Sequence, residues 1–317
     1  MRIANPIYDV VFKYLLDDEK AAKLVLSALL GREVLELQFR PTEVRREAAP
    51  ALGPSILVLR MDFAATVALE DGSRKLVLIE IQKARSPMDV LRFRRYLGSQ
   101  YSSEDNVFLD ETGRRLALPL VTIYFLGEGL DDIDVPVVKI NRHYTDAATG
   151  EQIPILDPFV EALTHDSIVV QIDRLRNRRR TDLERLLMVF DQGQARRSDP
   201  HLLDILEENF PERYRDVLRR LMRASSEQDI REGMDVEDEV LTTLQDRVRE
   251  IEEKNRTIEE KEKALKEKDE TLEEQARALE EQAKALEEQA RALEEKDQAL
   301  ERQNRHIEEL QRRLGRD

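Results

Sequence analysis

The sequence contains no cysteine, no tryptophan and no long apolar run, and these absences exclude several classes of protein. Without cysteine, the chain can form neither a disulfide framework nor a thiolate site for zinc or an iron–sulfur cluster, which fits a reducing compartment. Its longest apolar run, residues 116–126, is about half the ~20 residues that a membrane-spanning helix needs. The first ten residues lack the apolar segment of a secretory signal. We therefore expect a soluble, cytoplasmic protein with no membrane partner.

Residue patterns for several common chemistries are also missing. The 11 glycines are scattered and form no phosphate-binding loop, so nucleotide hydrolysis has no support in the sequence. Neither a G-x-S-x-G nucleophile elbow nor a Cys/His nucleophile is present. We assign no role to the histidines because none has metal-ligand spacing to another: His143, His165, His201 and His306.

Charged residues make up 37% of the chain, well above the ~25% of an ordinary globular protein, and the net charge is −15. Residues 236–317 carry 26 acidic and 17 basic side chains, and the remainder carries 40 acidic and 34 basic ones. Because neither part has an excess of basic side chains, any contact with DNA must use a local basic patch.

The last third of the sequence repeats every seven residues. Near-copies of one heptad read TLEEQAR, ALEEQAK and ALEEQAR, and no proline follows Pro211. An apolar residue occupies the same heptad position throughout: Leu244, Ile251, Ile258, Leu265, Leu272, Leu279, Leu286, Leu293, Leu300, Ile307 and Leu314. This period predicts a coiled coil over residues 244–314, either as a homodimer or with a different helix. Polar residues in the second core column, such as Asp269, predict modest stability. The alternative is a solitary helix held by i,i+4 ion pairs.

The first two-thirds alternates helical and strand patterns, which indicates an α/β core. The Asn5-Pro6 pair predicts the start of the first helix, and Gly31 suits the end of the second. Strands are expected at residues 56–68, 75–82, 118–125, 137–140 and 167–172, and helices at 87–101 and from Arg180 up to the tail. We therefore divide the chain into a core at residues 1–180, a helical extension at 181–235 and a coiled-coil helix at 236–317.

Two carboxylates interrupt apolar strands, Asp62 in LVLRMDFAA and Glu80 in LVLIEIQKA. A carboxylate among strand hydrophobics is costly unless it is paired or binds a cation. A three-residue loop, Asp71-Gly72-Ser73, would place Asp62 opposite Gln82 and all three polar side chains on one face. A two-residue loop would put Asp62 on the other face.

Clustered carboxylate oxygens suit a hard cation such as Mg²⁺. The alternative is that Asp62 and Glu80 merely pair with the nearby basic side chains of Arg60 or Lys83.

Four segments, NPIYDVVFKYLL, MDFAATV, LVLIEIQKA and RFRRYLGSQY, together resemble the Rpn-like PD-(D/E)XK nuclease family of recombination-promoting nucleases and putative transposases. The resemblance covers about residues 5–101. It implies a restriction-endonuclease-like core, in which helices flank a mixed sheet, followed here by the helical region and the coiled coil. It also implies a metal-dependent DNA endonuclease that acts in recombination or DNA mobilisation.

The resemblance assigns roles to individual residues. Asp62, Glu80 and the backbone carbonyl of Ile81 would hold Mg²⁺ or Mn²⁺. Gln82 falls where the broader superfamily has its catalytic lysine, and it brings no positive charge.

Two residues of the first helix complete the expected catalytic set. Asp9 matches the acidic position of this helix in the family. If this helix packs over the site, Lys13 is a better substitute for the missing lysine charge than Lys83, which should point to the opposite face of its strand.

Basic and aromatic residues further along are candidates for DNA contact. By the resemblance, Arg92 and Tyr96 lie on the helix after the second carboxylate strand, and Arg92 shares a face with Arg95 at helical spacing. Arg178 and Arg179 belong to the densest basic cluster, which could contact phosphates or merely solvate a loop.

Two other functions compete with the nuclease. In one, the glutamine has weakened catalysis, and the chain is a nuclease-fold scaffold that binds DNA or a protein partner through its coiled coil. In the other, the chain is a structural filament protein, but residues 1–235 carry too many core and strand signals for that. Metal binding at Asp62 and Glu80 favours the enzyme, whereas ion pairs that fill the site favour the scaffold.

Overall fold

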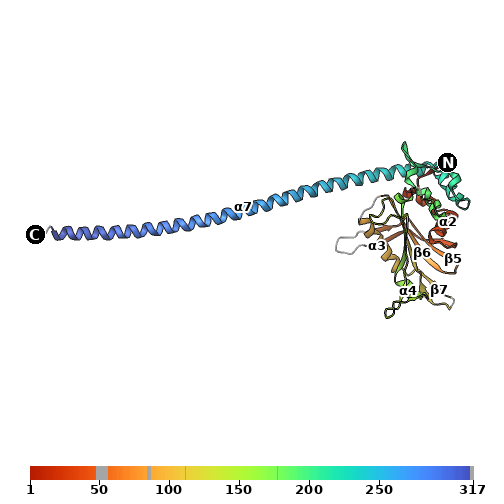
Figure 1. Ribbon diagram of the computed structural model, residues 1–317, viewed down its shortest axis with the longest axis horizontal. Coiled ribbons are helices and arrows are strands. Elements are labelled where there is room, and N and C mark those ends of the chain that lie inside the picture. The colour runs from red at the N-terminus through yellow and green to blue at the C-terminus, as the bar shows by residue number, and fades with distance from the viewer. Residues whose placement is uncertain (48–55, 84–86, 111, 177, 315–317) are drawn as a thin grey trace. The chain divides into compact units, whose positions relative to one another are not determined.

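The computed structural model describes residues 1–47, 56–83, 87–110, 112–176 and 178–314, without the side chains of 44–47, 56–60, 87–89 and 310–314. The chain divides into two units, Met1–Val240 and Leu241–Asp317. The second unit belongs to the helix α7 (Gln228–Leu314), which begins in the first unit (Figure 1). No helix in the described part is long and apolar enough to cross a membrane.

A mixed sheet of six strands forms the centre of the first unit. In spatial order its strands are β10 (Val137–Ile140), β13 (His165–Gln171), β9 (Leu120–Leu126), β6 (Arg74–Gln82), β5 (Phe63–Leu69) and β2 (Val34–Phe39). The three strands β6, β9 and β13 run parallel, and all other neighbouring pairs are antiparallel. Helix α3 (Pro87–Tyr101) makes the crossover between the parallel strands β6 and β9, as a parallel connection requires.

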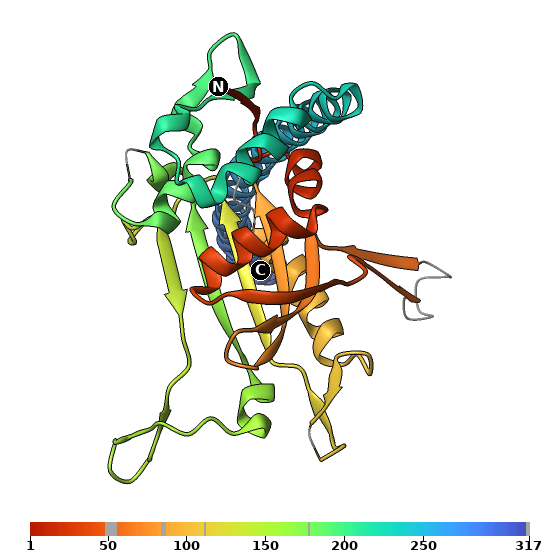
Figure 2. The ribbon, with the colours of Figure 1, turned by 90° about the vertical axis from the view of Figure 1, so that its right-hand side faces the viewer.

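Helices cover both faces of the sheet. On β6, Val77 and Ile79 belong to the larger core. The buried side chains of α1 (Asp9–Leu16) and α2 (Glu19–Leu30) belong to the same core. Figure 2 shows α2 lying across this face. Residues of opposite parity, such as Leu78, pack in a second core against α3. The α/β prediction is confirmed, and burial on both faces explains why the central strands are apolar throughout.

Shorter elements complete the first unit. Strand β1 (Arg2–Ala4) pairs with β15 (Asp199–Asp204), which also pairs with β14 (Ala195–Arg196). Three two-stranded ribbons are β3–β4 (Glu43–Glu47, Ile56–Arg60), β7–β8 (Val107–Leu109, Arg115–Ala117) and β11–β12 (Tyr144–Thr145, Gln152–Ile153). The remaining α-helices are α4 (Pro158–Leu163), α5 (Asp182–Leu187) and α6 (Arg215–Ala224). Among the described residues there are also the 3-10 turns η2 (Ile172–Leu175), η3 (Met188–Phe190), η4 (Gln192–Gln194), η5 (Glu207–Asn209) and η6 (Glu212–Tyr214).

The helix predictions are correct for the second helix and for α3, but not for the first. Asp18 caps α2 by accepting the Ala21 N–H at 2.8 Å, and Gly31 ends it with φ +74°. The first helix begins at Asp9 rather than at Asn5-Pro6. The Asn5 N–H instead donates to the His201 carbonyl, because β1 keeps the chain extended up to this point.

The expected strand 56–68 is two strands. Residues 56–60 form β4, which pairs with β3, whereas β5 starts at Phe63 in the central sheet. The break falls at Met61 and Asp62, where the chain leaves the ladder of the central sheet.

The hairpin between β5 and β6 has a three-residue loop, but the loop lies one residue earlier than predicted. Ala68 pairs with Arg74, and the Leu69 N–H donates to the Ser73 carbonyl, so the loop is Glu70-Asp71-Gly72. Gly72 has φ +80°, which explains where the turn forms. The register therefore places Glu80, not Gln82, opposite the position of Asp62. Because the shift is two residues, the polar side chains keep their common face.

The region after Arg180 is not entirely helical as expected, because it contains β14 and β15. Leu202 and Leu203, both buried in β15, are too short an apolar stretch to show a period of two.

Candidate functional site

The two carboxylates come together at the edge of the sheet where the parallel strands end. Glu80 is near the carboxyl end of β6, and Asp62 immediately precedes β5, its antiparallel neighbour. In sheets with parallel strands, this edge is where ligands usually bind. The α1 helix brings Asp9 and Lys13 to the same place.

Asp62 replaces a main-chain acceptor of the sheet. Its Oδ2 accepts the Ile81 N–H at 2.7 Å, the bond that the carbonyl of Met61 would have made if β5 had continued. Its Oδ1 lies 3.8 Å from the Lys13 Nζ, and its side chain is only 15% exposed. Burial, followed by the negative charges of Glu80 and Asp9, raises the pKa of Asp62 to about 8. Burial is thus the main reason that Asp62 favours its neutral form, and the neighbouring carboxylates of Glu80 and Asp9 add to it.

Glu80 is almost fully buried, at 2% exposure, and its Oε1 accepts a hydrogen bond from the Arg92 Nη2 at 2.5 Å. Arg92 reaches in from α3 and is itself half exposed. Burial and the Glu80 charge raise the pKa of Tyr96 to about 12, so this tyrosine stays neutral.

The first helix supplies the cation nearest to Asp62. Lys13 donates to the Asp9 Oδ2 at 2.6 Å. Burial lowers the pKa of Lys13, but the hydrogen bond to Asp9 and the charges of Asp9 and Asp62 outweigh it, so the net shift is upward. Lys13 therefore keeps its positive charge beside the carboxylates.

Two buried polar atoms at the site lack a hydrogen-bond partner within the described residues: Asp9 Oδ1 and Gln82 Nε2. A buried polar atom is costly when it is unsatisfied, so these two are available to a water, an ion or a substrate group.

Residues of α7 hold the first helix in place, which the sequence analysis missed. Tyr8, the N-cap residue of α1, makes no side-chain cap. Glu237 caps the helix instead, because its two carboxylate oxygens accept the Asp9 and Val10 N–H groups at 2.9 and 2.8 Å. Burial raises the pKa of Glu237 despite these bonds. The acidic Glu237-Asp238 pair resembles the charged coil that follows it, so no sequence signal points to this contact.

Lys83 belongs to this supporting cluster and not to the carboxylate site. Its Nζ lies 2.9 Å from Asp238 Oδ1 and 3.1 Å from the ring centroid of Tyr8. Asp238 Oδ2 also binds the Tyr8 hydroxyl and His201 Nε2, each at 2.9 Å. The alternative in which Lys83 neutralises Asp62 or Glu80 is therefore wrong. The side chain of Arg60, the other alternative, lies outside the described residues.

The site matches a small, hard cation better than a metal held by protein alone. In the described part of the chain, no group of three or more His, Cys, Asp or Glu is placed to hold a metal. Mg²⁺ usually takes one or two carboxylates and completes its shell with waters and phosphate oxygens. Asp62 and Glu80 fit that requirement, and a divalent ion would offset the charge that raises the pKa of Asp62. Ile81 is fixed by its N–H bond to Asp62, and a role for its carbonyl stays a prediction.

The DNA-contact candidates do not all reach the surface. Arg92 and Arg95 are exposed on α3, but Tyr96 is 1% exposed and donates to the Pro41 carbonyl. Tyr96 is thus a core residue, and its assignment to DNA contact is wrong. Arg178 and Arg179 follow the turn after β13, so they lie beyond the same edge of the sheet as Gln82.

The neighbouring basic side chains are engaged. Arg180 pairs with Glu184 at 2.7 Å, and Arg174 pairs with Asp134 at 3.2 Å.

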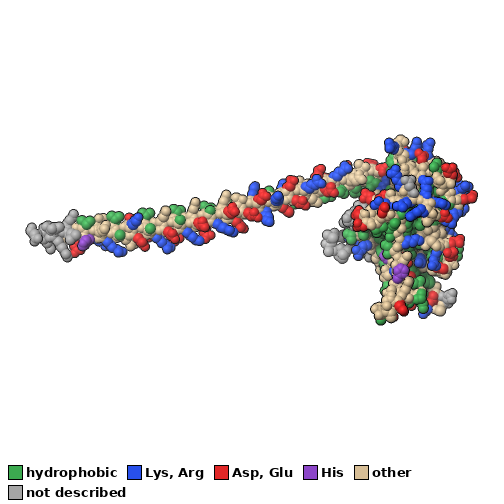
Figure 3. All heavy atoms as spheres, viewed as in Figure 1, with side chains coloured by type: hydrophobic (Ala, Val, Ile, Leu, Met, Phe, Trp, Pro, Cys, Tyr) green, Lys and Arg blue, Asp and Glu red, His purple; other side chains and the backbone are tan. Residues whose placement is uncertain are grey.

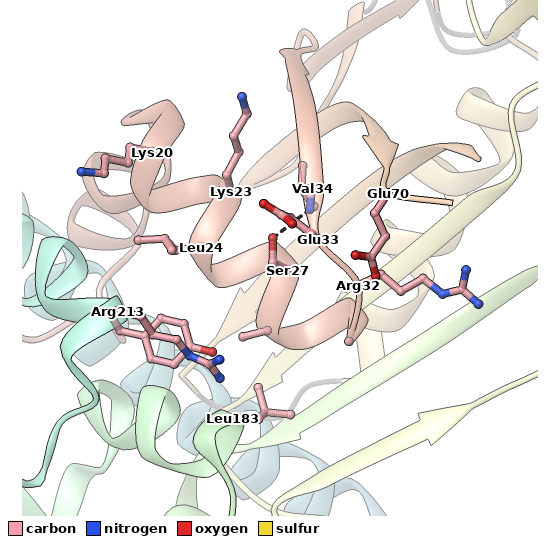
Figure 4. A pocket seen from close by; sticks show the side chains of 13 residues that line it. Lys20, Lys23, Leu24, Ser27, Arg32, Glu33, Val34, Glu70, Leu183 and Arg213 are labelled. Atoms are coloured by element: carbon pink, nitrogen blue, oxygen red, sulfur yellow. Dashed lines mark hydrogen bonds between the residues drawn. The ribbon is translucent and has the colours of Figure 1, made fainter. Parts of the chain in front are cut away.

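A cavity of about 640 Å³ lies elsewhere, along α2, and contains none of the candidate site residues (Figure 4). Several of its basic side chains already have acidic partners: Lys20 with Asp216, Lys23 with Glu19, and Arg213 with Asp182. Because these charges are balanced, the cavity offers less reactive chemistry than the carboxylate site does.

No protein-family model matches the chain, and comparisons with curated proteins and with solved structures give no match.

Proposed function

We propose that the chain is a Mg²⁺- or Mn²⁺-dependent DNA endonuclease with a PD-(D/E)XK-like core. The observation that carries this proposal is the meeting of Asp62 and Glu80, with Asp9 beside them, at the end of the parallel strands, where burial and the repulsion between the carboxylates raise the pKa of Asp62. A divalent ion bound between the two carboxylates would relieve that repulsion and would favour the ionised form of Asp62.

The order of the elements supports the proposal. The helix that carries Asp9 and Lys13 comes first, and the strand that begins after Asp62 follows it. The strand with Glu80 and Gln82 is next, and then the helix with Arg92. The resemblance to the Rpn-like nucleases implies this same order.

Each site residue has a task in phosphodiester hydrolysis. Asp62 and Glu80 would hold the metal, which when bound lowers the pKa of a coordinated water and neutralises charge on the scissile phosphate. Lys13, charged and beside Asp62, stabilises the additional negative charge that develops on the phosphate. The Gln82 amide, whose Nε2 has no partner in the described part, can donate a hydrogen bond that orients the attacking water.

A cleavage assay on supercoiled and linear DNA with Mg²⁺ or Mn²⁺ tests the proposal. We expect cutting that EDTA abolishes and that Asp62→Ala and Glu80→Ala reduce at least about 100-fold, since each removes a metal ligand. Asp132→Ala, which removes an exposed acid outside the site, should cut like the native chain. Cutting that survives both site variants would reject the assignment. If both variants lose cutting, Gln82→Ala shows whether the Gln82 amide contributes to it.

The second candidate function is a nuclease-fold scaffold without turnover. The ion pair between Arg92 and Glu80, together with glutamine in the place of the catalytic lysine, favours it. The scaffold predicts no cleavage of any DNA form by the native chain. It also predicts that Arg92→Gln weakens folding, because removing Arg92 leaves the buried Glu80 without this compensating charge.

A further inference from the structure

The tail helix presents an apolar column to solvent. Figure 3 shows hydrophobic side chains at its surface among the charged ones. Ten residues of this column have 51% to 66% of their surface exposed in the single chain: Leu244, Ile251, Ile258, Leu265, Leu272, Leu279, Leu286, Leu293, Leu300 and Ile307. They extend over about 95 Å at 1.5 Å per residue. We propose that the column binds the same column of a second copy of the chain, with the two helices parallel and in register.

The charges beside the column complement themselves only in the parallel orientation. If the column is position d, position e is Glu in eight of ten heptads: 252, 259, 273, 280, 287, 294, 301 and 308. Position g from 247 to 303 is basic or Gln and never acidic. In a parallel pair, each g residue faces the e residue of the partner's next heptad. An antiparallel pair would instead align e with e, so Glu would face Glu along almost its whole length.

In register, four g-to-e contacts join opposite charges: Arg247–Glu252, Lys254–Glu259, Lys268–Glu273 and Lys296–Glu301. One contact, Lys261 with Lys266, is unfavourable. The balance favours two copies of this helix over an unrelated partner, because the complementary charges are already present on the two flanks of one chain.

The acidic residues at position a fit the same arrangement. In a parallel pair in register, the hole that receives an a side chain includes the partner's preceding g residue. Each acidic a residue directly follows a lysine at g: Glu262 after Lys261, Asp269 after Lys268, and Asp297 after Lys296. Where a is Ala276, Ala283, Ala290 or Asn304, the preceding g residue is glutamine. A lysine thus accompanies the carboxylates that would otherwise face their own copies.

The i,i+4 ion pairs of the single helix leave this surface uncovered. Glu280 pairs with Lys284 at 2.7 Å and Glu287 with Arg291 at 2.6 Å, and both basic partners occupy position b. Because b lies away from the a and d columns, these pairs support the helix without burying its apolar column. The solitary-helix alternative therefore leaves about 95 Å of apolar surface in water.

Cysteine cross-linking of the full chain tests orientation and register on a background without native cysteine. Val248→Cys and Ala290→Cys, both at position a, should each form a disulfide-linked dimer rapidly under mild oxidation. Ala278→Cys, at the outward position c, is the control and should link far more slowly. An antiparallel pair can link at no more than one of the two a positions. Cross-linking at only one of them, or a monomer in sedimentation at micromolar concentration, would overturn the proposal.

A charge reversal tests the lysines at g. Lys268→Glu sets a carboxylate beside the partner's Asp269 and Glu273, so the dissociation constant of the dimer should rise about tenfold or more. Lys263→Glu makes the same charge change at position b and should alter it less than about twofold. Circular dichroism of both variants confirms that the helix is retained. Equal effects of the two variants would contradict the assigned g-to-a and g-to-e contacts.

Discussion

Asp62 is a buried carboxylate that lies among other carboxylates. It completes the sheet hydrogen bonding through Ile81 while it faces Glu80 and Asp9, so its charge is stabilised by one amide and opposed by two acids. The alternation of residues along the strands is enough to find such a position, because a carboxylate between apolar neighbours is visible in the sequence. Its raised pKa is not visible there, because it depends on the helix and strands that surround it.

The pKa of Asp62 predicts how stability depends on pH. Between its ordinary value of 3.8 and about 8, the folded chain holds a proton that the unfolded chain has released. The contribution of Asp62 to the free energy of unfolding therefore falls as pH rises across this window and levels off above it. Urea unfolding in EDTA from pH 5 to 9 should show the native chain losing stability relative to Asp62→Asn. Parallel curves for the two proteins would contradict the raised pKa.

Gly127 follows β9 at the edge that carries the site, and a side chain there has no room. A Cβ at this position would lie 2.1 Å from the Lys83 carbonyl oxygen. Gly127→Ala must therefore push the chain after β6 away from β9, at a cost of roughly 2 kcal/mol or more. Gly98→Ala is the matched control, since its Cβ would meet no atom within 4 Å. Thermal unfolding should show a large loss for the first variant and a small gain for the second, and equal melting temperatures would refute this packing.

At the scale of elements, the start of α7 caps the start of α1 and so positions the residues that α1 brings to the site. Glu237 accepts the first two N–H groups of α1, and Gly233 lets α7 approach Val10 closely, since a Cβ there would lie 3.0 Å from a Val10 methyl. The placement of Asp9 and Lys13 beside Asp62 thus depends on a helix more than 200 residues away in sequence.

Removal of this cap should loosen α1. We expect Glu237→Ala to lower the free energy of unfolding by about 1 kcal/mol, the usual cost of losing a helix cap. Hydrogen exchange of the Asp9 and Val10 amides should accelerate more than exchange in α3. Glu208→Ala, an exposed acid elsewhere, serves as the control. Unchanged hydrogen exchange at the start of α1 would show that Glu237 does not stabilise the first turn of this helix.

The sequence predicts elements well where their signals are local and poorly where they are not. The ends of α2 follow from Asp18 and Gly31, and the common face of Asp62 and Glu80 follows from the period of two. The predicted register of the hairpin differs from the observed one by two residues. The position of the loop depends on the positive φ of Gly72, which the strand pattern does not reveal. The break after β4 and the pairing of β15 with β1 depend on partners distant in sequence.

In the complete chain, an α/β unit is joined to a long helix for which we propose self-association. A parallel coil would attach two N-terminal units at the same end of the coil, so one particle would carry two carboxylate sites. With the proposed nuclease activity, such a particle would cut both strands of a duplex in one encounter, whereas a monomer would have to return for the second cut.

Loss of the coil contact should therefore change the products of cleavage. In Leu279→Ser combined with Leu286→Ser, two buried positions of the proposed dimer become polar. We expect supercoiled DNA to accumulate as the nicked form with this variant and as the linear form with the native chain at equal protein concentration. Gel analysis over time gives the ratio of nicked to linear DNA. If the variant is monomeric and this ratio is unchanged, dimerisation does not determine the products of cleavage.

Binding of Mn²⁺ without DNA, followed by electron paramagnetic resonance or calorimetry, shows whether Asp62 and Glu80 hold a metal. We expect the native chain to bind Mn²⁺, and we expect Asp62→Asn and Glu80→Gln each to weaken binding at least about tenfold, since each removes a charged ligand. Asp132→Asn should bind like the native chain. Equal binding by all four proteins, or none by the native chain, would contradict a metal site between Asp62 and Glu80.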